Sequence, residues 1–125
     1  MMAEATPLEL ASRVTADGQD VITFRGELDI TTADQAYAYV RAVIDKHTLD
    51  DRAAAISVDL ADLTFCDAAG LGALTRIANY AQKARRQLRL TGPRPFLVRL
   101  MRITRLDRRF PELRSPALQV LAMAI

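Results

Sequence analysis

The fold of this chain is decided by the stretch DLADLTFCDAAGLGALTRI, residues 59–77. An almost uninterrupted apolar run at 53–60 leads into it and predicts a central strand buried on both faces. Asp67 then stands where a carboxylate can accept the free N–H groups of a helix start. The expected helix spans about residues 68–86, with apolar residues every three or four positions and basic residues in its last turn.

Two glycines, Gly70 and Gly72, stand in the first turns of this helix. Glycine there lowers helix stability by about 1 kcal/mol relative to alanine. This cost indicates that another group must come close to the helix backbone at these positions. One interpretation is that bare N–H groups and small side chains form a flat platform for another molecule. The other is that the glycines serve only the packing of the helix on the sheet. The sequence leaves both open.

Upstream of this stretch the chain predicts a β-hairpin followed by a helix. Residues 8–15 alternate apolar and polar, Asp17-Gly18 marks a tight turn, and residues 21–26 form the second strand. Thr31 or Thr32 is expected to cap a helix that runs to about residue 46.

Downstream, residues 88–92 predict a third core strand and residues 95–107 a helix whose start is bracketed by two prolines. Residues 110–113 are expected to form a final short strand. The alternation of strands and helices predicts an α/β fold with a mixed, mostly parallel β-sheet, an N-terminal hairpin and helices packed on the sheet.

In such sheets the loops that follow parallel strands meet at one rim, where ligands and partners bind. Here those loops are Glu27–Thr32, Thr64–Ala68 and Thr91–Arg94. Four rim carboxylates could hold Mg²⁺ or act as an acid/base pair: Glu27, Asp29, Asp62 and Asp67. We expect no metal, because Asp67 is placed to cap the helix and Asp62 is expected in a turn.

Composition limits the remaining classes. A chain of 125 residues that is 50% hydrophobic and 26% charged forms one compact domain. Its single cysteine, Cys66, and single histidine, His47, exclude an internal disulfide and a zinc site built from both residue types. No signal peptide or membrane span is apparent, so we expect a cytoplasmic protein with no membrane insertion.

Charge is distributed unevenly along the chain. Residues 1–72 carry 5 basic and 13 acidic side chains, whereas residues 73–125 carry 12 basic and 2 acidic ones. Aromatic side chains for base stacking are scarce there, so we expect solvated helix faces and no nucleic-acid partner. The basic residues assigned to such faces are Lys83, Arg85, Arg86, Arg89, Arg99, Arg102, Arg105, Arg108 and Arg109.

Catalytic motifs are missing from the sequence. There is no P-loop and no GxGxxG fingerprint, serine occurs only at 12, 57 and 115, and His47 is the only imidazole. We therefore expect neither an enzyme nor a cofactor. Cys66, close to a helix start, is either a redox switch or a small buried hydrophobic residue.

Three motifs in order carry a resemblance to a known family. They are Gly26-Glu27-Leu28-Asp29, Asp59-Leu60-x-x-Leu63-Thr64-Phe65-Cys66-Asp67 and Gly70-Leu71-Gly72-x-Leu74, and Leu106-Asp107-Arg108-x-Phe110-Pro111 is also similar. The chain resembles the STAS domain of bacterial anti-sigma factor antagonists over residues 8–115. Residues 1–7 are then an N-terminal tail and residues 116–125 a C-terminal helical segment.

The resemblance implies a regulator of sigma-factor-dependent transcription without catalytic activity. Family members bind an anti-sigma factor, usually a serine kinase with a histidine-kinase-like ATPase fold, and so release a sigma factor. The kinase ends the interaction by phosphorylating the Ser or Thr that follows the motif aspartate. Transferred by motif, the partner-binding residues are Asp29, Thr31, Asp67, Ala68, Ala69, Gly70, Leu71 and Gly72.

This chain departs from the family at the phosphorylated position, which is occupied by Ala68. Thr64, in the same loop, is the fallback hydroxyl. Alanine resembles the dephosphorylated state, so the resemblance implies an always-on antagonist, or a scaffold or decoy.

Two other hypotheses stay open. One is the small STAS subunit of an ABC-type lipid transport complex, and the other is a ligand-sensing STAS module. The oligomeric state is open too, a dimer included.

Overall fold

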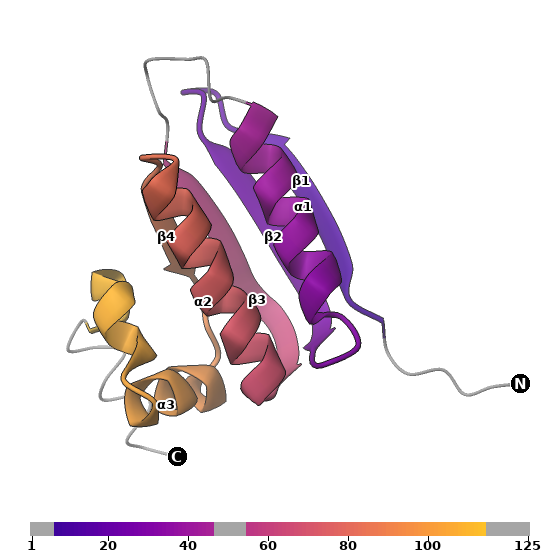
Figure 1. Cartoon of the computed structure of the whole chain (residues 1–125), viewed down its shortest axis with the longest axis vertical. Helices are drawn as coiled ribbons and strands as arrows, with labels where there is room; N and C mark the ends of the chain where they lie inside the picture. The colour runs from indigo at the N-terminus through magenta and orange to yellow at the C-terminus, as the bar shows by residue number, and fades with distance from the viewer. Residues whose placement is uncertain (1–6, 47–54, 115–125) are drawn as a thin grey trace, which may run out of the picture.

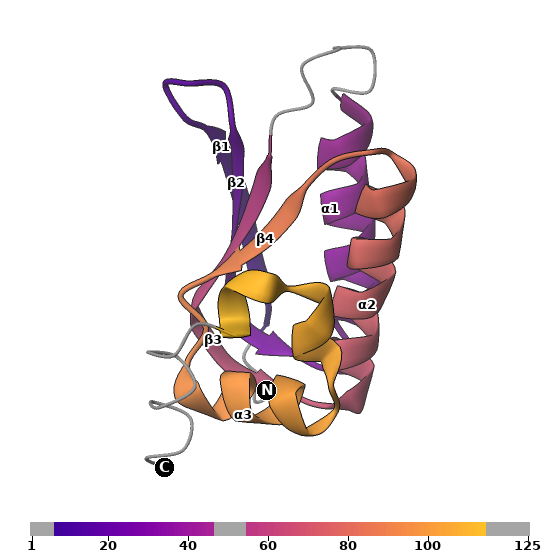
Figure 2. The same ribbon diagram turned by 90° about the vertical axis from the view of Figure 1, so that its left-hand side faces the viewer.

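The computed structural model describes residues 7–46 and 55–114. These residues form two layers, a sheet and a pair of helices, as Figures 1 and 2 show. The strands are β1 (Glu9–Val14), β2 (Asp20–Leu28), β3 (Ile56–Cys66) and β4 (Leu88–Thr91). The helices are α1 (Ala33–Lys46), α2 (Ala68–Lys83) and α3 (Pro95–Ile103), followed by two 3₁₀ helices, η1 (Leu106–Arg109) and η2 (Pro111–Arg114).

The sheet has the strand order β1-β2-β3-β4. Only the β1–β2 pair is antiparallel, and the other two pairs are parallel, which confirms the predicted mixed sheet with an N-terminal hairpin. The hairpin turn is where the sequence predicts it. Gly18 has a φ of +87°, a conformation that glycine adopts without strain, and its N–H donates to the carbonyl of Thr15 at 3.0 Å.

Both long helices cover the same face of the sheet (Figure 2). β3 is central, as predicted, but the expectation that it is buried on both faces is wrong. Ile56, Val58 and Leu60 are buried, whereas Ser57 and Asp59 between them are only half-buried. The apolar core lies between the sheet and the helix layer, and within the described residues the opposite face of β3 has no helix over it.

Arg86 is not on a solvated face, contrary to the prediction. Its side chain is 2% exposed and its Nη2 lies 3.1 Å from a carboxylate oxygen of Asp20, whose side chain is 4% exposed. Its Nη1 also donates to the carbonyl of Ile44 at 3.4 Å. Arg85, with a φ of 60°, turns the chain just before it. Arg86 therefore ties the end of α1, the start of β2 and the α2–β4 connection together.

The chain after β4 differs from the prediction. α3 ends at Ile103 instead of residue 107, and Arg105 then adopts a left-handed φ of 63°. Residues 110–113 form no strand, because Phe110, between the 3₁₀ helices η1 and η2, and Leu113, in η2, are buried without one. The two apolar residues are thus buried by a backbone conformation other than the expected strand. The predicted helical segment 116–125 lies outside the described residues.

The predicted rim forms from two loops, not three. β3 continues to Cys66, which pairs with Leu28 at the end of β2, so the loops after β2 and β3 lie side by side. β4 ends at Thr91, opposite Asp59 in the middle of β3. The Thr91–Arg94 loop therefore lies beside the middle of β3 and not at its end. The reason is that β3 extends several residues beyond its apolar run.

Candidate functional site

The loop between β2 and α1 is organised by Asp29. Its carboxylate accepts hydrogen bonds from the backbone N–H of Thr31 at 2.9 Å and the hydroxyl of Thr31 at 2.6 Å. The bond from the Thr31 side chain is the main reason why the pKa of Asp29 lies below its ordinary value. Thr32 precedes α1, but its hydroxyl points back into the loop and donates to the carbonyl of Glu27 at 2.9 Å. These bonds hold the loop so that Ile30 projects into solvent, 79% exposed.

The start of α2 is held by Asp67. Its carboxylate accepts the N–H of Gly70 at 2.9 Å, which confirms the predicted cap. Its own N–H donates to the carbonyl of Leu28 at 3.3 Å, which joins the helix start to the end of β2. Asp67 therefore stabilises the start of α2 and its position against β2.

The other rim carboxylates are dispersed. Asp62 lies in β3, not in a turn, and is 3.5 Å from Arg25 of β2. Glu27 is part of β2. Within residues 7–46 and 55–114, no group of three or more His, Cys, Asp or Glu side chains is placed to hold a metal ion.

The two glycines of α2 differ in their surroundings. A Cβ on Gly70 would lie 2.3 Å from the carbonyl oxygen of Leu28 and 2.8 Å from Sγ of Cys66. Gly70 is thus glycine because the helix packs directly on the end of β2. A Cβ on Gly72 would meet no atom within 4 Å, and Gly72 is exposed. Only Gly72 offers an approach to another molecule.

The remaining partner-binding residues expected from the sequence also divide into accessible and buried ones. Ala68 and Thr31 are exposed, whereas Leu71 belongs to the core and Ala69 is half-buried. Two residues that the sequence reasoning missed, Ile30 and Phe65, are large exposed hydrophobics beside this site. An apolar residue in each of the two rim loops was the signal that could have found them.

We name this accessible set the docking surface. It lies around the paired residues that end β2 and β3 and includes the first turns of α2. Its members are Ile30, Thr31, Phe65, Ala68 and Gly72.

Cys66 lies beneath the docking surface and is buried. Burial, with a smaller contribution from the charge of Asp67, raises its pKa from 9.0 to about 12. A neutral, buried thiol favours the small-hydrophobe interpretation over the redox switch.

We therefore expect Cys66 to resist alkylation in the folded chain. At pH 8 its thiolate fraction is roughly a thousandfold smaller than that of a thiol with the ordinary value. Because the unfolded chain releases this proton first, the stabilising contribution of the neutral thiol is complete below about pH 9 and lost between about pH 9 and 12. Mass spectrometry of iodoacetamide-treated protein, with and without urea, checks this. Equal rates in both conditions would restore the redox interpretation.

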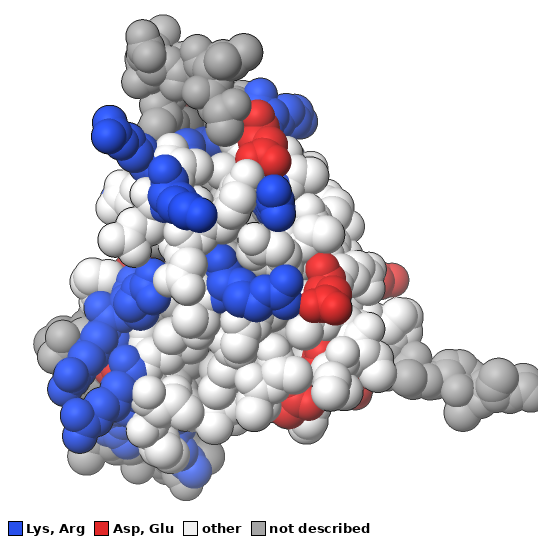
Figure 3. Space-filling view, viewed as in Figure 1, with Lys and Arg blue, Asp and Glu red and all other residues white. Residues whose placement is uncertain are grey.

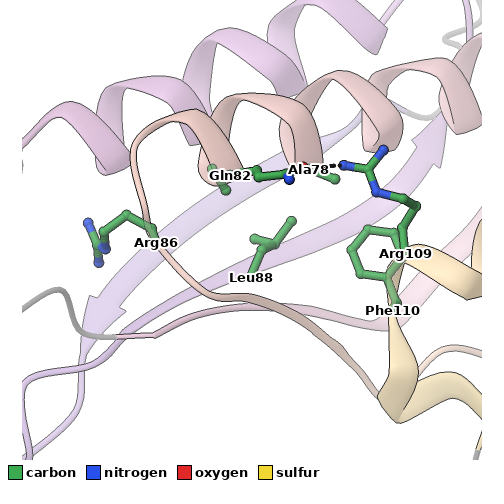
Figure 4. A pocket seen from close by; sticks show the side chains of 7 residues that line it. Ala78, Gln82, Arg86, Leu88, Arg109 and Phe110 are labelled. Atoms are coloured by element: carbon green, nitrogen blue, oxygen red, sulfur yellow. Dashed lines mark hydrogen bonds between the residues drawn. The ribbon is translucent and has the colours of Figure 1, made fainter.

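A separate cavity of about 210 Å³ lies between α2, β4 and η1 (Figure 4). Leu88 and Phe110 contribute apolar surface, and Arg109 Nη2 donates to Gln82 at 3.3 Å across it. Figure 4 shows the guanidinium of Arg86 pointing away from Arg109. None of the cavity's lining residues belongs to the docking surface.

Basic side chains gather on the part of the surface formed by the second half of the chain. Figure 3 shows blue side chains concentrated on the side where α3 lies in Figure 1, while acidic ones lie toward α1. On the face that Figure 3 shows, the basic side chains are thus densest near α3. None of the described helices is long and apolar enough to cross a membrane.

Comparisons with solved structures find the same fold. An anti-sigma factor antagonist from Mycobacterium paratuberculosis matches with a TM-score of 0.68 at 23% identity, over 88% of this chain and 88% of that chain. Unphosphorylated SpoIIAA, an anti-sigma factor antagonist, matches with a TM-score of 0.58 at 20% identity, over 76% and 83%. Phosphorylated SpoIIAA, a Bacillus cell fate determinant, matches with a TM-score of 0.57 at 20% identity, over 82% and 88%. None of the curated proteins compared with this chain matches it.

A family model described as "Mlab, STAS domain" matches residues 11–122. This match spans nearly the whole chain, and the mixed four-stranded sheet with its helix layer agrees with it. The chain belongs to the STAS domain family.

Proposed function

We propose that this chain is a binding module of the anti-sigma factor antagonist type, which docks on an anti-sigma factor through the docking surface and performs no chemistry itself. The observation that carries the proposal is the exposure of Ile30 (79%), in the loop after β2, and of Phe65 (45%), three residues before the start of α2. Large exposed apolar side chains near one another in the fold are typical of protein interfaces. The structural likeness to anti-sigma factor antagonists supports this choice of partner.

The proposed module is not switched by phosphorylation at the start of α2. Ala68 offers no hydroxyl. The fallback hydroxyl, that of Thr64, donates to the carbonyl of Gly26 at 3.1 Å and so helps join β3 to β2. A partner kinase therefore has no free serine or threonine at the family position, and the complex is expected to persist in the presence of ATP.

Purification of the complex from the native cells tests this proposal. We expect an anti-sigma factor with a histidine-kinase-like ATPase fold to co-purify, and the complex to survive incubation with ATP. Mass spectrometry should find no phosphate on Thr31, Thr32 or Thr64. Stoichiometric phosphate on one of them, with release of the partner, would show that the switch has moved to another residue.

Ala68→Glu is expected to weaken partner binding while leaving the fold intact. An acidic residue in the first turn interacts favourably with the helix dipole, by about 0.3–1 kcal/mol. An unpaired charge in the centre of an interface should weaken binding by at least about 2 kcal/mol, roughly a thirtyfold higher Kd. Calorimetric titration and thermal melts measure both effects.

Ala38→Glu, on the exposed part of α1, is the matched control because it adds the same charge outside the docking surface. It should leave the Kd unchanged. If both variants bound as tightly as the parent chain, the docking surface would have to lie elsewhere.

A second candidate is the small STAS subunit of an ABC-type lipid transport complex. The missing hydroxyl at Ala68 favours it, because such a subunit needs no phosphorylation site, and the matching family model carries the description "Mlab". Co-purification of a transporter ATPase subunit instead of an anti-sigma factor would select this function.

A ligand-sensing module has less support. Arg76 is the first basic side chain of α2, and it is engaged by Asp34 at 2.8 Å and stacks over the ring of Tyr37 at 4.2 Å.

A further inference from the structure

We propose that two copies of this chain pair through β1, edge to edge and antiparallel, about a two-fold axis at Ala11. β1 lies at one end of the sheet and, among the described strands, pairs only with β2 (Figure 1). Its second edge therefore presents the backbone groups of every second residue along this six-residue strand, without a partner among the described strands. Such an edge is a template for another strand, and a second copy brings a strand of the same length.

The two edges of the sheet are not equivalent. β4 has only four residues, and its edge N–H at Leu90 already donates to the carboxylate of Glu112 at 2.7 Å. The 3₁₀ helix η2 thus occupies part of that edge. β1 has no comparable cover within residues 7–46 and 55–114, so self-pairing is expected there.

Side chains of β1 alternate between the two faces of the sheet. The hydroxyl of Tyr39 on α1 donates to Oγ of Ser12 at 3.1 Å, so Ser12 faces the helix layer. By alternation Glu9, Ala11 and Arg13 lie on the opposite, open face. In an antiparallel pair, directly opposed residues share a face, so only registers that oppose open-face residues with one another are allowed.

Charge selects one register from these. With the axis at Ala11, Glu9 of each copy lies opposite Arg13 of the other, which forms two cross-strand ion pairs. With the axis at Ser12, Arg13 lies opposite Ala11 and no ion pair forms. Charged residues on an edge ordinarily discourage pairing, but here their order makes the edge complementary to itself.

The surroundings of β1 support a second copy as the occupant. Arg13 is exposed and forms no ion pair with another described residue, while Glu9 has only Arg25 as an ion-pair partner among the described residues, at 4.0 Å. Val14 is 54% exposed, so the end of β1 carries apolar surface that a second copy can cover. β1 shares no residue with the docking surface, so the dimer would present two docking surfaces.

Charge reversal tests the register in solution. Six residues of edge form a small interface, so we expect a concentration-dependent dimer in sedimentation equilibrium. Glu9→Arg and Arg13→Glu should each abolish it, because each variant places like charges opposite one another. Mixing the two variants should restore dimers, because every opposed pair is then Arg with Glu. Arg89→Glu, an exposed residue of β4, is the control and should dimerise like the parent chain.

Cross-linking tests the same register covalently. Ala11→Cys places a thiol opposite its own copy and should form a disulfide-linked dimer under mild oxidation, while the native Cys66 is buried. Ser12→Cys should not, because Ser12 lies opposite Leu10 in this register. Cross-linking of Ser12→Cys instead of Ala11→Cys, or monomers at every concentration with no cross-link, would overturn the proposal.

Discussion

Arg86→Ala is expected to lower the free energy of unfolding by about 3–5 kcal/mol. The substitution removes a buried guanidinium from the carboxylate of Asp20, 3.1 Å away, and from the carbonyl of Ile44. A buried carboxylate that loses its cation retains the full desolvation penalty, which exceeds the value of any surface ion pair. Urea denaturation followed by circular dichroism measures the change.

Arg89→Ala is the matched control, because it removes an exposed arginine three residues further along the chain. Its effect should stay within about 0.5 kcal/mol. The double variant Asp20→Val with Arg86→Met should be more stable than Arg86→Ala, since neither charge then remains buried. A loss for Arg86→Ala no larger than that of the control would show that the pair contributes nothing to the fold.

Gly70→Ala is expected to destabilise the chain, whereas Gly72→Ala should stabilise it. At Gly70 a methyl group would lie 2.3 Å from the backbone oxygen of Leu28, so the helix start or the end of β2 must move, which costs about 1–3 kcal/mol or more. At Gly72 the methyl group meets open space, and helix propensity contributes about 1 kcal/mol. Thermal melts of the two variants should therefore shift in opposite directions.

Measurements of partner binding distinguish the roles of the two glycines further. Gly72→Ala adds a methyl group on the docking surface and should weaken partner binding without loss of stability. If Gly72→Ala bound as tightly as the parent chain, the approach of the partner would have to avoid the first turns of α2. A rise in melting temperature for Gly70→Ala would contradict the packing described above.

The positions of the helices and strands were predictable because they depend on local patterns. Alternation at 8–15, the glycine turn at residue 18 and the helical spacing after Asp67 each report on a few neighbouring residues, and all three formed as predicted. The strand predicted at 110–113 failed because Phe110 and Leu113 could be buried equally well from 3₁₀ turns. Whether an apolar side chain is buried depends on which parts of the fold pack against it, and the local sequence pattern does not contain that information.

The sequence by itself determined the strand and helix order as far as α3, the cap at Asp67 and the absence of a hydroxyl at Ala68, since these follow from residue type and spacing. Only the tertiary structure decided what each residue meets. It separated Gly70, against the backbone of Leu28, from the open Gly72, and it buried Arg86 beside a carboxylate 66 residues away in the chain. Such contacts join residues that are distant in sequence, so their chemistry exists only once the chain has folded.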